Sequence, residues 1–247
     1  MVSFTVVIAC VDKHIKLMEQ TLESIEKYTI KPDKVIVSMS PRYLDLNLHD
    51  ESRRLEGKFP FLKCLVQDKV TGVGGNYNKC FEDEYVDTDY VTIWGADDFY
   101  HPQYFEILNH IIMKHDPSIL THSYDLHMAT EAEKNPSLAF NFDVFKKISL
   151  DKIRTYNNFF LIKEQQDISR FYSGEYMKFH KSKKEIALHY GMQTLKTHIV
   201  KENNFKVGPQ YDWKSDTLYL LDAYKKYRDM IYIDEILIQY MPSRSYA

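Results

Sequence analysis

Apolar residues in the first half of the chain form short runs that alternate with longer amphipathic segments. The runs are rich in β-branched residues, as expected for strands buried on both faces, and they span residues 3–11, 34–39, 61–66 and 90–94. The amphipathic segments span residues 15–28 and 45–57, a stretch opened by the glycine-rich turn 71–76, and a stretch with Pro102 in its first turn that ends before Asp116. This alternation predicts an α/β fold with a mostly parallel, Rossmann-like central sheet and helices on both faces.

The second half of the chain is less regular. It contains an apolar run at 138–145 that predicts a strand and an amphipathic stretch at 186–200 that predicts a helix. A further helix is predicted at 215–228, followed by a pair of strand-like runs at 231–240. The sequence contains no internal repeat, low-complexity tract or flexible linker, so we expect one domain, residues 1–247, with an irregular region in its second half.

Composition and charge exclude several classes of protein. With 247 residues, 44% of them hydrophobic, the chain can bury a substantial core. Its formal net charge of -3 argues against a nucleic-acid partner, because such surfaces are markedly basic. The three cysteines form no CxxC pair, which favours a reducing, cytoplasmic location. No signal peptide and no apolar run of membrane-spanning length is evident, so we expect no transmembrane segment.

Two adjacent acids, Asp97 and Asp98, follow the buried run at 90–94 and precede a helix that Pro102 initiates. This order places them at the carboxyl end of a strand, the edge where ligands bind in open α/β sheets. A divalent cation held by one or two carboxylates usually bridges the phosphates of a substrate. The alternative is that the acids cap the following helix, although a cap needs only one acid.

The order of these pieces resembles glycosyltransferase family 2. The resemblance covers most of the first half and the segment from Trp213 to the C-terminus, and its motifs are FTVVIACVD (4–12) with LESI (22–25), PDKVIVS (32–38), GVGGNYN (72–78), and GADD (95–98) followed by His-Pro (101–102). It implies the GT-A fold, with the nucleotide-sugar donor bound by residues 1–124 and the acceptor bound by residues 125–247. The acceptor class stays open among a glycan, a lipid-linked molecule and a protein.

The resemblance also implies roles for individual residues. Asp97 matches the last aspartate of the family's DXD metal motif, Asp98 extends the motif, and Gly95 replaces its first aspartate; a bound Mn²⁺ or Mg²⁺ is therefore expected on Asp97 and Asp98. The expected donor contacts are Ala9, Val11, Asp12, Ser38, Gly72, Asn78, Ala96, Asp97 and Arg244. Asp12 is expected near the base or ribose, and the planar fork of Arg244 suits the diphosphate.

A general base is expected at the start of the helix predicted at 215–228. Asp216 matches the family's catalytic aspartate best, and Asp212 is the reserve candidate. A helix N-terminus keeps a carboxylate ionised, as a base must be. The same position also allows Asp216 merely to complement the helix dipole. With a base here, the resemblance implies that the sugar is transferred with inversion, in a single displacement.

Two other functions remain open at this point. Because Gly95 departs from the DXD pattern, the chain can be a non-catalytic sugar-binding or assembly module of the same fold. A sugar nucleotidyltransferase would need a basic, glycine-rich phosphate loop directly after the first strand, and the segment 9–12 is a poor substitute. The oligomeric state is not predicted.

Overall fold

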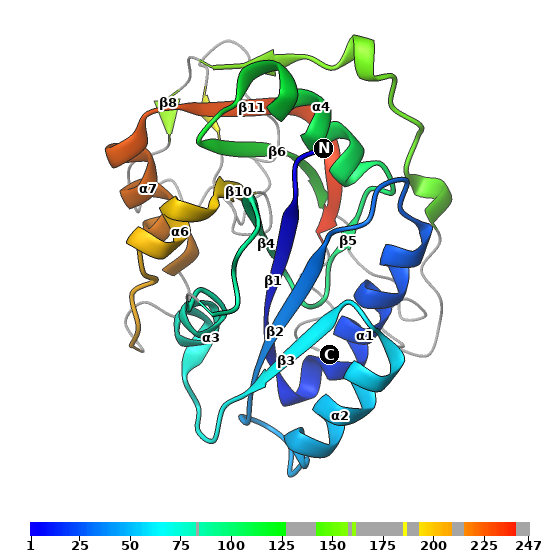
Figure 1. Cartoon of the computed structure of the whole chain (residues 1–247), viewed down its shortest axis with the longest axis vertical. Helices are drawn as coiled ribbons and strands as arrows, with labels where there is room; N and C mark the ends of the chain where they lie inside the picture. The colour runs from blue at the N-terminus through cyan, green and yellow to red at the C-terminus, as the bar shows by residue number, and fades with distance from the viewer. Residues whose placement is uncertain are drawn as a thin grey trace.

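One curled sheet organises the fold (Figure 1). The computed structural model describes residues 1–82, 84–126, 142–157, 160–161, 185–186, 193–208 and 215–240. Within this part of the chain, nine strands share a sheet in the order β3-β2-β1-β4-β10-β6-β11-β5, and β7 also pairs with β11. These strands are β1 Phe4–Val11, β2 Lys34–Ser40, β3 Leu62–Val66, β4 Tyr90–Trp94, β5 Phe99–Tyr100, β6 Ile119–Leu126, β7 Thr155–Tyr156, β10 Gln193–Lys196 and β11 Met230–Tyr240. A separate parallel pair joins β8 Phe160–Leu161 to β9 Glu185–Ile186.

The parallel part of the sheet is the part that the sequence predicts best. Strands β3, β2, β1 and β4 are parallel neighbours, and their runs match the predicted strands within two residues at each end. Beyond them, β10 is antiparallel to both β4 and β6, while β11 is parallel to β6. Most strands therefore point the same way, and the predicted mostly parallel sheet is confirmed.

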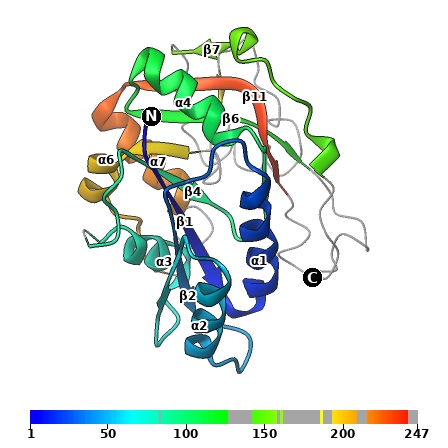
Figure 2. The same cartoon turned by 45° about the vertical axis from the view of Figure 1, so that its right-hand side comes forward.

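Helices cover both faces of this sheet, as predicted (Figures 1 and 2). They are α1 Ile15–Ser24, α2 Leu48–Lys58, α3 Gly72–Cys80, α4 Tyr104–His115, α6 Thr197–Glu202 and α7 Ser215–Tyr227. The side chains of β1 alternate between the faces, because successive residues of a strand point to opposite sides. Val6 and Ile8 pack with α1, α2 and α4, whereas Val7 packs with α3, α6 and α7. None of the described helices is long and apolar enough to cross a membrane.

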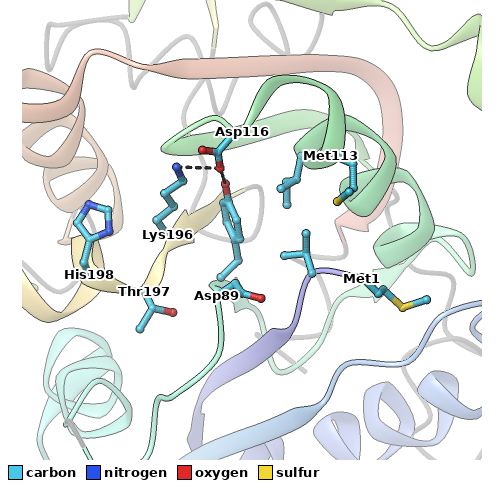
Figure 3. A pocket seen from close by; sticks show the side chains of 10 residues that line it. Met1, Asp89, Met113, Asp116, Lys196, Thr197 and His198 are labelled. Carbon is cyan, nitrogen blue, oxygen red and sulfur yellow. Dashed lines mark hydrogen bonds and ion pairs between the residues drawn. The ribbon is translucent and has the colours of Figure 1, made fainter.

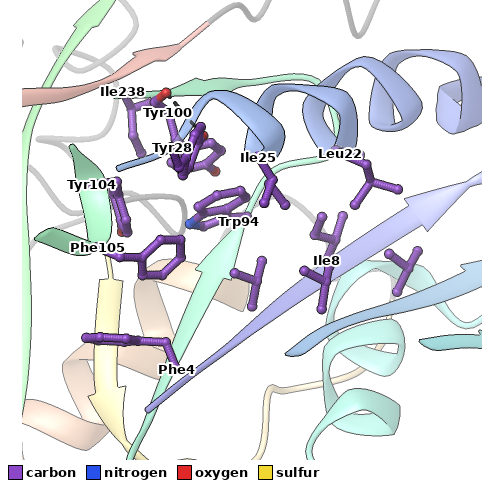
Figure 4. Packing of buried hydrophobic residues seen from close by; sticks show 14 of the residues in the cluster. Phe4, Ile8, Leu22, Ile25, Tyr28, Trp94, Tyr100, Tyr104, Phe105 and Ile238 are labelled. Carbon is purple, nitrogen blue, oxygen red and sulfur yellow. Dashed lines mark hydrogen bonds between the residues drawn. The ribbon is translucent and has the colours of Figure 1, made fainter. Parts of the chain in front are cut away.

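Aromatic rings fill the core beneath the loop that follows β4 (Figure 4). The indole of Trp94 stacks on the ring of Tyr100, with centroids 3.8 Å apart and planes at 8°. Tyr104 meets both rings edge-on, and Tyr28 packs against Trp94 from the end of the first helical segment. Trp94 and Tyr100 flank residues 95–99 in the sequence, so the stacking of their rings holds the two ends of this loop together.

Some predicted elements are wrong. Residues 193–196 of the predicted helix 186–200 form β10, and the helix α6 begins only at Thr197. The pattern misleads because Leu195 and Ile199 fit one helical face, while tertiary pairing with two strands holds 193–196 extended. In the predicted strand 138–145, residues 142–144 form a 3₁₀ turn, and 138–141 lie outside the described residues. The runs at 231–240 form one strand, and β5 and β6 were not predicted.

Candidate active site at the carboxyl edge of the sheet

The predicted donor-binding segments meet at one edge of the sheet. In the parallel register Ala9 lies beside Ser38 and Val11 beside Ser40, while Ile8 pairs with Trp94 on the other side. The chain then leaves β4 at Gly95. The ends of β1 and β2 and the loop 95–98 therefore lie side by side, with α3 packed against β1 and β2.

A buried threonine in α1 holds the loop that carries the two aspartates. The hydroxyl of Thr21 lies 3.0 Å from the carbonyl oxygen of Asp98 and 3.3 Å from that of Ala96, and it donates to them. The N–H of Gly95 donates to the hydroxyl of Tyr100 at 2.8 Å. Sequence analysis did not single out Thr21, although a polar residue on the apolar face of a predicted helix was a usable signal.

The two aspartates are both withdrawn from solvent. Asp97 is 4% exposed and Asp98 is fully buried. Burial raises the pKa of the Cys10 thiol near the end of β1, and the charges of Asp97 and Asp12 raise it further. Asp12 directly follows β1, and Asp97 lies in the loop after β4, the strand that pairs with β1, so both carboxyl groups lie at the same edge of the sheet. Asp98 also raises the pKa of Tyr100, second to the effect of that hydroxyl's own burial.

Asp12, predicted to contact the base or ribose, has its carboxylate engaged by backbone groups. It is 2% exposed and accepts the N–H groups of Lys13, Arg42, Tyr43 and Leu44 at distances of 2.8–3.0 Å. Burial alone raises the pKa of Asp12, but these hydrogen bonds outweigh it, and the pKa lies below its usual value. The carboxylate thus fixes the turn between β2 and α2 at the candidate site.

Neutral polar side chains fill the space between the end of β2 and α3. The amide oxygen of Asn76 accepts hydrogen bonds from Ser38, Gln67 and Thr71, and its NH₂ group donates to the hydroxyl of Ser40 at 3.0 Å. Ser38, Ser40 and Asn76 are all at most 1% exposed. Ser38 thus lies near the end of β2, and its hydroxyl belongs to a buried network. Asn76 was not among the predicted site residues.

The glycine-rich segment lies inside α3 and allows this helix to approach the backbone of residues 205–206 closely. Gly72 opens the helix with φ of 69°, a conformation that glycine adopts readily. A Cβ on Gly74 would lie 2.7 Å from the carbonyl oxygen of Lys206. Asn78 completes this contact, since its amide exchanges two hydrogen bonds, at 3.0 and 2.7 Å, with the backbone of Phe205. Asn78 therefore joins α3 to the segment 203–208.

The predicted catalytic base lies at the start of α7. Asp216 is the second residue of this helix, and the predicted helix is confirmed. The reserve base Asp212 and the predicted diphosphate contact Arg244 lie outside the described residues. Helix α7 packs toward α3 through the ring of Tyr219, which stacks on Phe205 with centroids 4.1 Å apart. The first turn of α7 thus belongs to the layer that covers the α3 side of the sheet.

In the described part of the chain, Asp97 and Asp98 would hold a cation together with ligands supplied by a substrate. Among the described residues, no group of three or more His, Cys, Asp or Glu side chains is placed to hold a metal. His101, after the aspartates, accepts the N–H of Gln103 through Nδ1 at 2.9 Å, so its Nε2 donates to the carbonyl of Lys146. The carboxylate of Asp97 fits a hard cation that takes its other ligands from phosphates and water.

A pocket of about 590 Å³ lies at the opposite, amino-terminal edge of the parallel strands (Figure 3). Met1 and Met113 line it, and its polar centre is the ion pair between Lys196 and Asp116, at 2.9 Å. The hydroxyl of Tyr90 lies 3.3 Å from Asp116 and donates to it. No residue predicted to bind the donor lines this pocket, so it is separate from the candidate site.

Several solved structures of other proteins share this fold. S. aureus TarS (residues 1–349) matches with a TM-score of 0.65 and 14% identity over 99% of this chain and 62% of the TarS chain. Its complex with UDP-GlcNAc matches with a TM-score of 0.63 and 13% identity over 99% of this chain and 61% of that chain. The mannosyltransferase PcManGT from Pyrobaculum calidifontis, in complex with GDP-Man and Mn²⁺, matches with a TM-score of 0.56 and 14% identity over 97% of this chain and 56% of that chain.

These matches define the class of the fold as GT-A, a mixed α/β architecture with a mostly parallel sheet. The family model of glycosyl transferase family 2 matches residues 5–183, and the chain belongs to this family. The chain spans about three fifths of the length of these two TarS structures and 38% of a longer TarS structure. No curated protein matches the sequence.

Proposed function

We propose that the protein transfers a sugar from a nucleotide diphosphate sugar to an acceptor hydroxyl. The observation that carries the proposal is the position of Asp97 at the carboxyl edge of the sheet, beside the end of β1. Family membership supports it, as do the ligands in two structural neighbours, UDP-GlcNAc in TarS and GDP-Man with Mn²⁺ in PcManGT. The acceptor is a glycan, a lipid-linked molecule or a protein, and the proposed location is cytoplasmic.

Asp97 would hold the cation, Mn²⁺ or Mg²⁺, in this proposal. It retains some exposure, whereas Asp98 has none, so Asp97 is the principal ligand and Asp98 the second. When bound, the cation supplies Lewis-acid stabilisation of the charge on the leaving diphosphate. Thr21 keeps the loop 95–98 in place beneath it through the carbonyls of Ala96 and Asp98.

Asp216 would remove the proton from the acceptor hydroxyl. The acceptor oxygen attacks the anomeric carbon, the bond from that carbon to the diphosphate oxygen breaks, and the proton passes to the carboxylate. This single displacement inverts the anomeric configuration. The place of Asp216 in the first turn of α7 supports the role, because the helix N-terminus favours the ionised form. Asp212 stays the reserve candidate.

The other predicted donor contacts divide into two groups. Ala9, Val11, Gly72 and Ala96 are proposed to contact the donor through the backbone at the sheet edge, and Arg244 through its guanidinium. Ser38, Asp12 and Asn78 are engaged within the protein, and we assign them to holding the walls of the donor site. We therefore expect substitutions of these three residues to change sugar transfer by moving the loops that form the donor site.

The test is release of the nucleoside diphosphate from a panel of UDP-, GDP- and dTDP-linked sugars, with and without Mn²⁺. Asp97→Ala is expected to lower the rate at least about 100-fold, because the leaving group loses its charge stabilisation. Asp87→Ala, which removes an exposed carboxylate before the amino-terminal end of β4, is the matched control and should leave the rate unchanged. Both variants should keep the wild-type melting temperature.

Three outcomes separate the candidate functions. An Asp97→Ala protein as active as the wild type would end the metal proposal. Binding of a nucleotide sugar without any release, in the presence of acceptor mixtures and Mn²⁺, would favour the non-catalytic module. Formation of a nucleotide sugar from a sugar phosphate and a nucleoside triphosphate would favour the nucleotidyltransferase.

A further inference from the structure

A segment from the second half of the chain packs against the residues that follow the two aspartates. We call this segment, residues 142–148, the bracing segment. It runs alongside residues 99–103, and the contacts keep the same order in both stretches: Phe99 meets Phe142, His101 meets Phe145 and Lys146, and Gln103 meets Ile148. The contact nearest to the aspartates is the first of these, because Phe99 directly follows Asp98.

The side chain of Phe99 depends on the bracing segment for its packing. Phe99 is 2% exposed, yet it lies outside the two large hydrophobic clusters and forms a separate cluster with Phe142 and Phe145. Its ring meets that of Phe142 edge-on, with centroids 5.8 Å apart and planes at 90°. Trp94 and Tyr100, in contrast, pack within the main core. Within the described part of the chain, the bracing segment therefore supplies the hydrophobic cluster that buries Phe99.

Two buried polar side chains fix the backbone of the bracing segment. The amide of Gln103 accepts the N–H of Ile148 at 2.7 Å and donates to the carbonyl of the same residue at 3.1 Å. The Nε2 of His101 donates to the carbonyl of Lys146 at 3.0 Å. Burial lowers the pKa of His101, which favours the neutral ring whose Nδ1 accepts the N–H of Gln103. Because buried polar groups are costly when they lose their partners, these hydrogen bonds hold the bracing segment in one position.

The peptide unit between Asp98 and Phe99 is held from two sides. The hydroxyl of Thr21, in α1, donates to the carbonyl oxygen of Asp98 at 3.0 Å. The ring of Phe142, in the bracing segment, contacts the ring of Phe99. A peptide unit is planar and moves as one body, so a shift of Phe99 also turns the backbone that carries Asp98 and, before it, Asp97. The positions of both carboxylates therefore depend on Phe142.

We propose that Phe142 is a positioning residue for the proposed cation site and acts on Asp97 and Asp98 through Phe99. This role rests on the proposed function, because it requires a cation on these aspartates. Removal of a group that orients metal ligands typically lowers metal affinity about 10- to 100-fold. Loss of the Phe142 ring should therefore raise the concentration of Mn²⁺ that the enzyme needs. The rate at saturating Mn²⁺ should change little, because both carboxylates remain.

The first test is hydrogen exchange of the full chain without metal or nucleotide. Phe142→Ala is expected to speed exchange of the backbone amides in the loop 95–98 at least about three-fold, because the loop loses one of its two supports. Phe142→Leu keeps an apolar side chain and should restore most of the protection. Val144→Ala, which shortens a side chain of the same segment that is 48% exposed, is the matched control and should leave the exchange unchanged. Melting curves check that each variant is folded. Unchanged exchange at 95–98 in Phe142→Ala would overturn the proposal.

The second test measures the Mn²⁺ concentration that gives half-maximal release of the nucleoside diphosphate from a nucleotide sugar. Phe142→Ala is expected to raise this concentration at least about ten-fold and to keep kcat at saturating Mn²⁺ within about two-fold of the wild type. Val144→Ala should resemble the wild type in both quantities. An unchanged Mn²⁺ requirement in Phe142→Ala, or a lower rate that saturating Mn²⁺ does not restore, would overturn the positioning role. A wild type that releases no nucleoside diphosphate would refute the proposed function instead, and the exchange measurement decides the coupling between Phe142 and the loop in either case.

Discussion

Acidic side chains at the carboxyl edge differ in the groups that they already bind. Asp12 and Asp97 lie close enough to Cys10 to raise the pKa of its thiol, yet they occupy different positions on the sheet edge. Asp12 holds four backbone N–H groups, which keep it ionised and bind the β2–α2 loop. Asp97 follows β4 and retains slight exposure. At the scale of single residues, Asp12 thus holds the site together, whereas the proposed cation is assigned to Asp97.

Asp12→Asn tests the structural role of this carboxylate. The amide replaces one acceptor oxygen by an NH₂ group that faces backbone donors, and buried donors left without acceptors cost about 2 kcal/mol. We expect the free energy of unfolding in urea to fall by about this amount. Asp45→Asn, on the same loop but exposed, should change it by less than about 0.5 kcal/mol. Equal effects of the two substitutions would contradict the role assigned to Asp12.

His122 makes the stability of the core sensitive to acid. It is 1% exposed, its Nδ1 donates to the carbonyl of Ser123, and its Nε2 lies 3.3 Å from the hydroxyl of Tyr104. Burial lowers its pKa from 6.5 to about 4. Below pH 6.5 this histidine is protonated in the unfolded chain but stays neutral in the folded chain. The free energy of unfolding therefore decreases as the pH is lowered from 6.5, and its decrease levels off below about pH 4.

His122→Gln should remove this dependence. Urea unfolding between pH 7 and pH 4 is expected to show a loss of up to about 3 kcal/mol for the wild type that is absent from the variant. The two unfolding free energies should therefore converge as the pH falls. His49→Gln, an exposed histidine of α2, is the matched control. A wild-type slope that persists in His122→Gln would assign the acid sensitivity to other groups.

Sequence patterns identify some site residues and not others for a physical reason. Asp97 was predictable because its neighbours in sequence, a buried strand and a proline-initiated helix, fix its place at a sheet edge. The partners of Asp12 lie about thirty residues away in the loop 42–44, and no local pattern reports such a contact. The network of Asn76 likewise spans β2 and α3. Long-range hydrogen bonds thus set the roles that sequence analysis missed.

Secondary structure elements also divide into those that a local sequence pattern predicts and those that depend on long-range contacts. The strands of the parallel half have continuous apolar runs, and α3 begins where the glycine-rich turn predicts. The element β10 was mistaken for part of a helix, because its four residues carry too little pattern to distinguish a strand from a helical turn. Its conformation comes from pairing with β4 and β6. Short elements between strands therefore depend on tertiary contacts.

The contact between α3 and the segment 203–208 provides a test at this scale. Gly74→Ala places a Cβ 2.7 Å from the carbonyl oxygen of Lys206, so the helix must shift, and we expect a loss of about 1–3 kcal/mol in the free energy of unfolding. Gly57→Ala, in α2, meets no atom within 4 Å and should stabilise the protein by up to about 1 kcal/mol. Urea unfolding measures both. A neutral Gly74→Ala would show that the two segments are not packed closely.

At the scale of the whole molecule, the sequence predicts the secondary structure of the first half of the chain well, whereas tertiary contacts determine that of the second half. The parallel strands β3-β2-β1-β4 come from the first 94 residues, and their order places the ends of β1, β2 and β4 together. The rest of the sheet joins β6 to β11 across more than a hundred residues of sequence. Such pairing has no local signal, which is why the sequence predicts the proposed donor side and leaves the acceptor side open.

Donor binding should therefore be visible as stabilisation of the whole fold. A ligand that binds only the native state raises its stability by about 2.7 kcal/mol at 100 times its Kd, which raises the Tm of a chain of this size by about 5–10 °C. We expect one of the UDP-, GDP- or dTDP-linked sugars to do so in the presence of Mn²⁺, and a CMP-linked sugar, which lacks a diphosphate, to show little dependence on Mn²⁺.

Two variants separate the donor site from the rest of the molecule in the same thermal-shift measurement. Asp97→Ala should keep the intrinsic Tm but lose the part of the shift that depends on Mn²⁺. Asp87→Ala, which removes an exposed carboxylate before the amino-terminal end of β4, should keep the full shift, because it lies at the opposite edge of the sheet. If Asp97→Ala retained the wild-type response to Mn²⁺, the cation would be bound elsewhere. A loss of the shift in Asp87→Ala would mean that the shift does not report binding at the carboxyl edge.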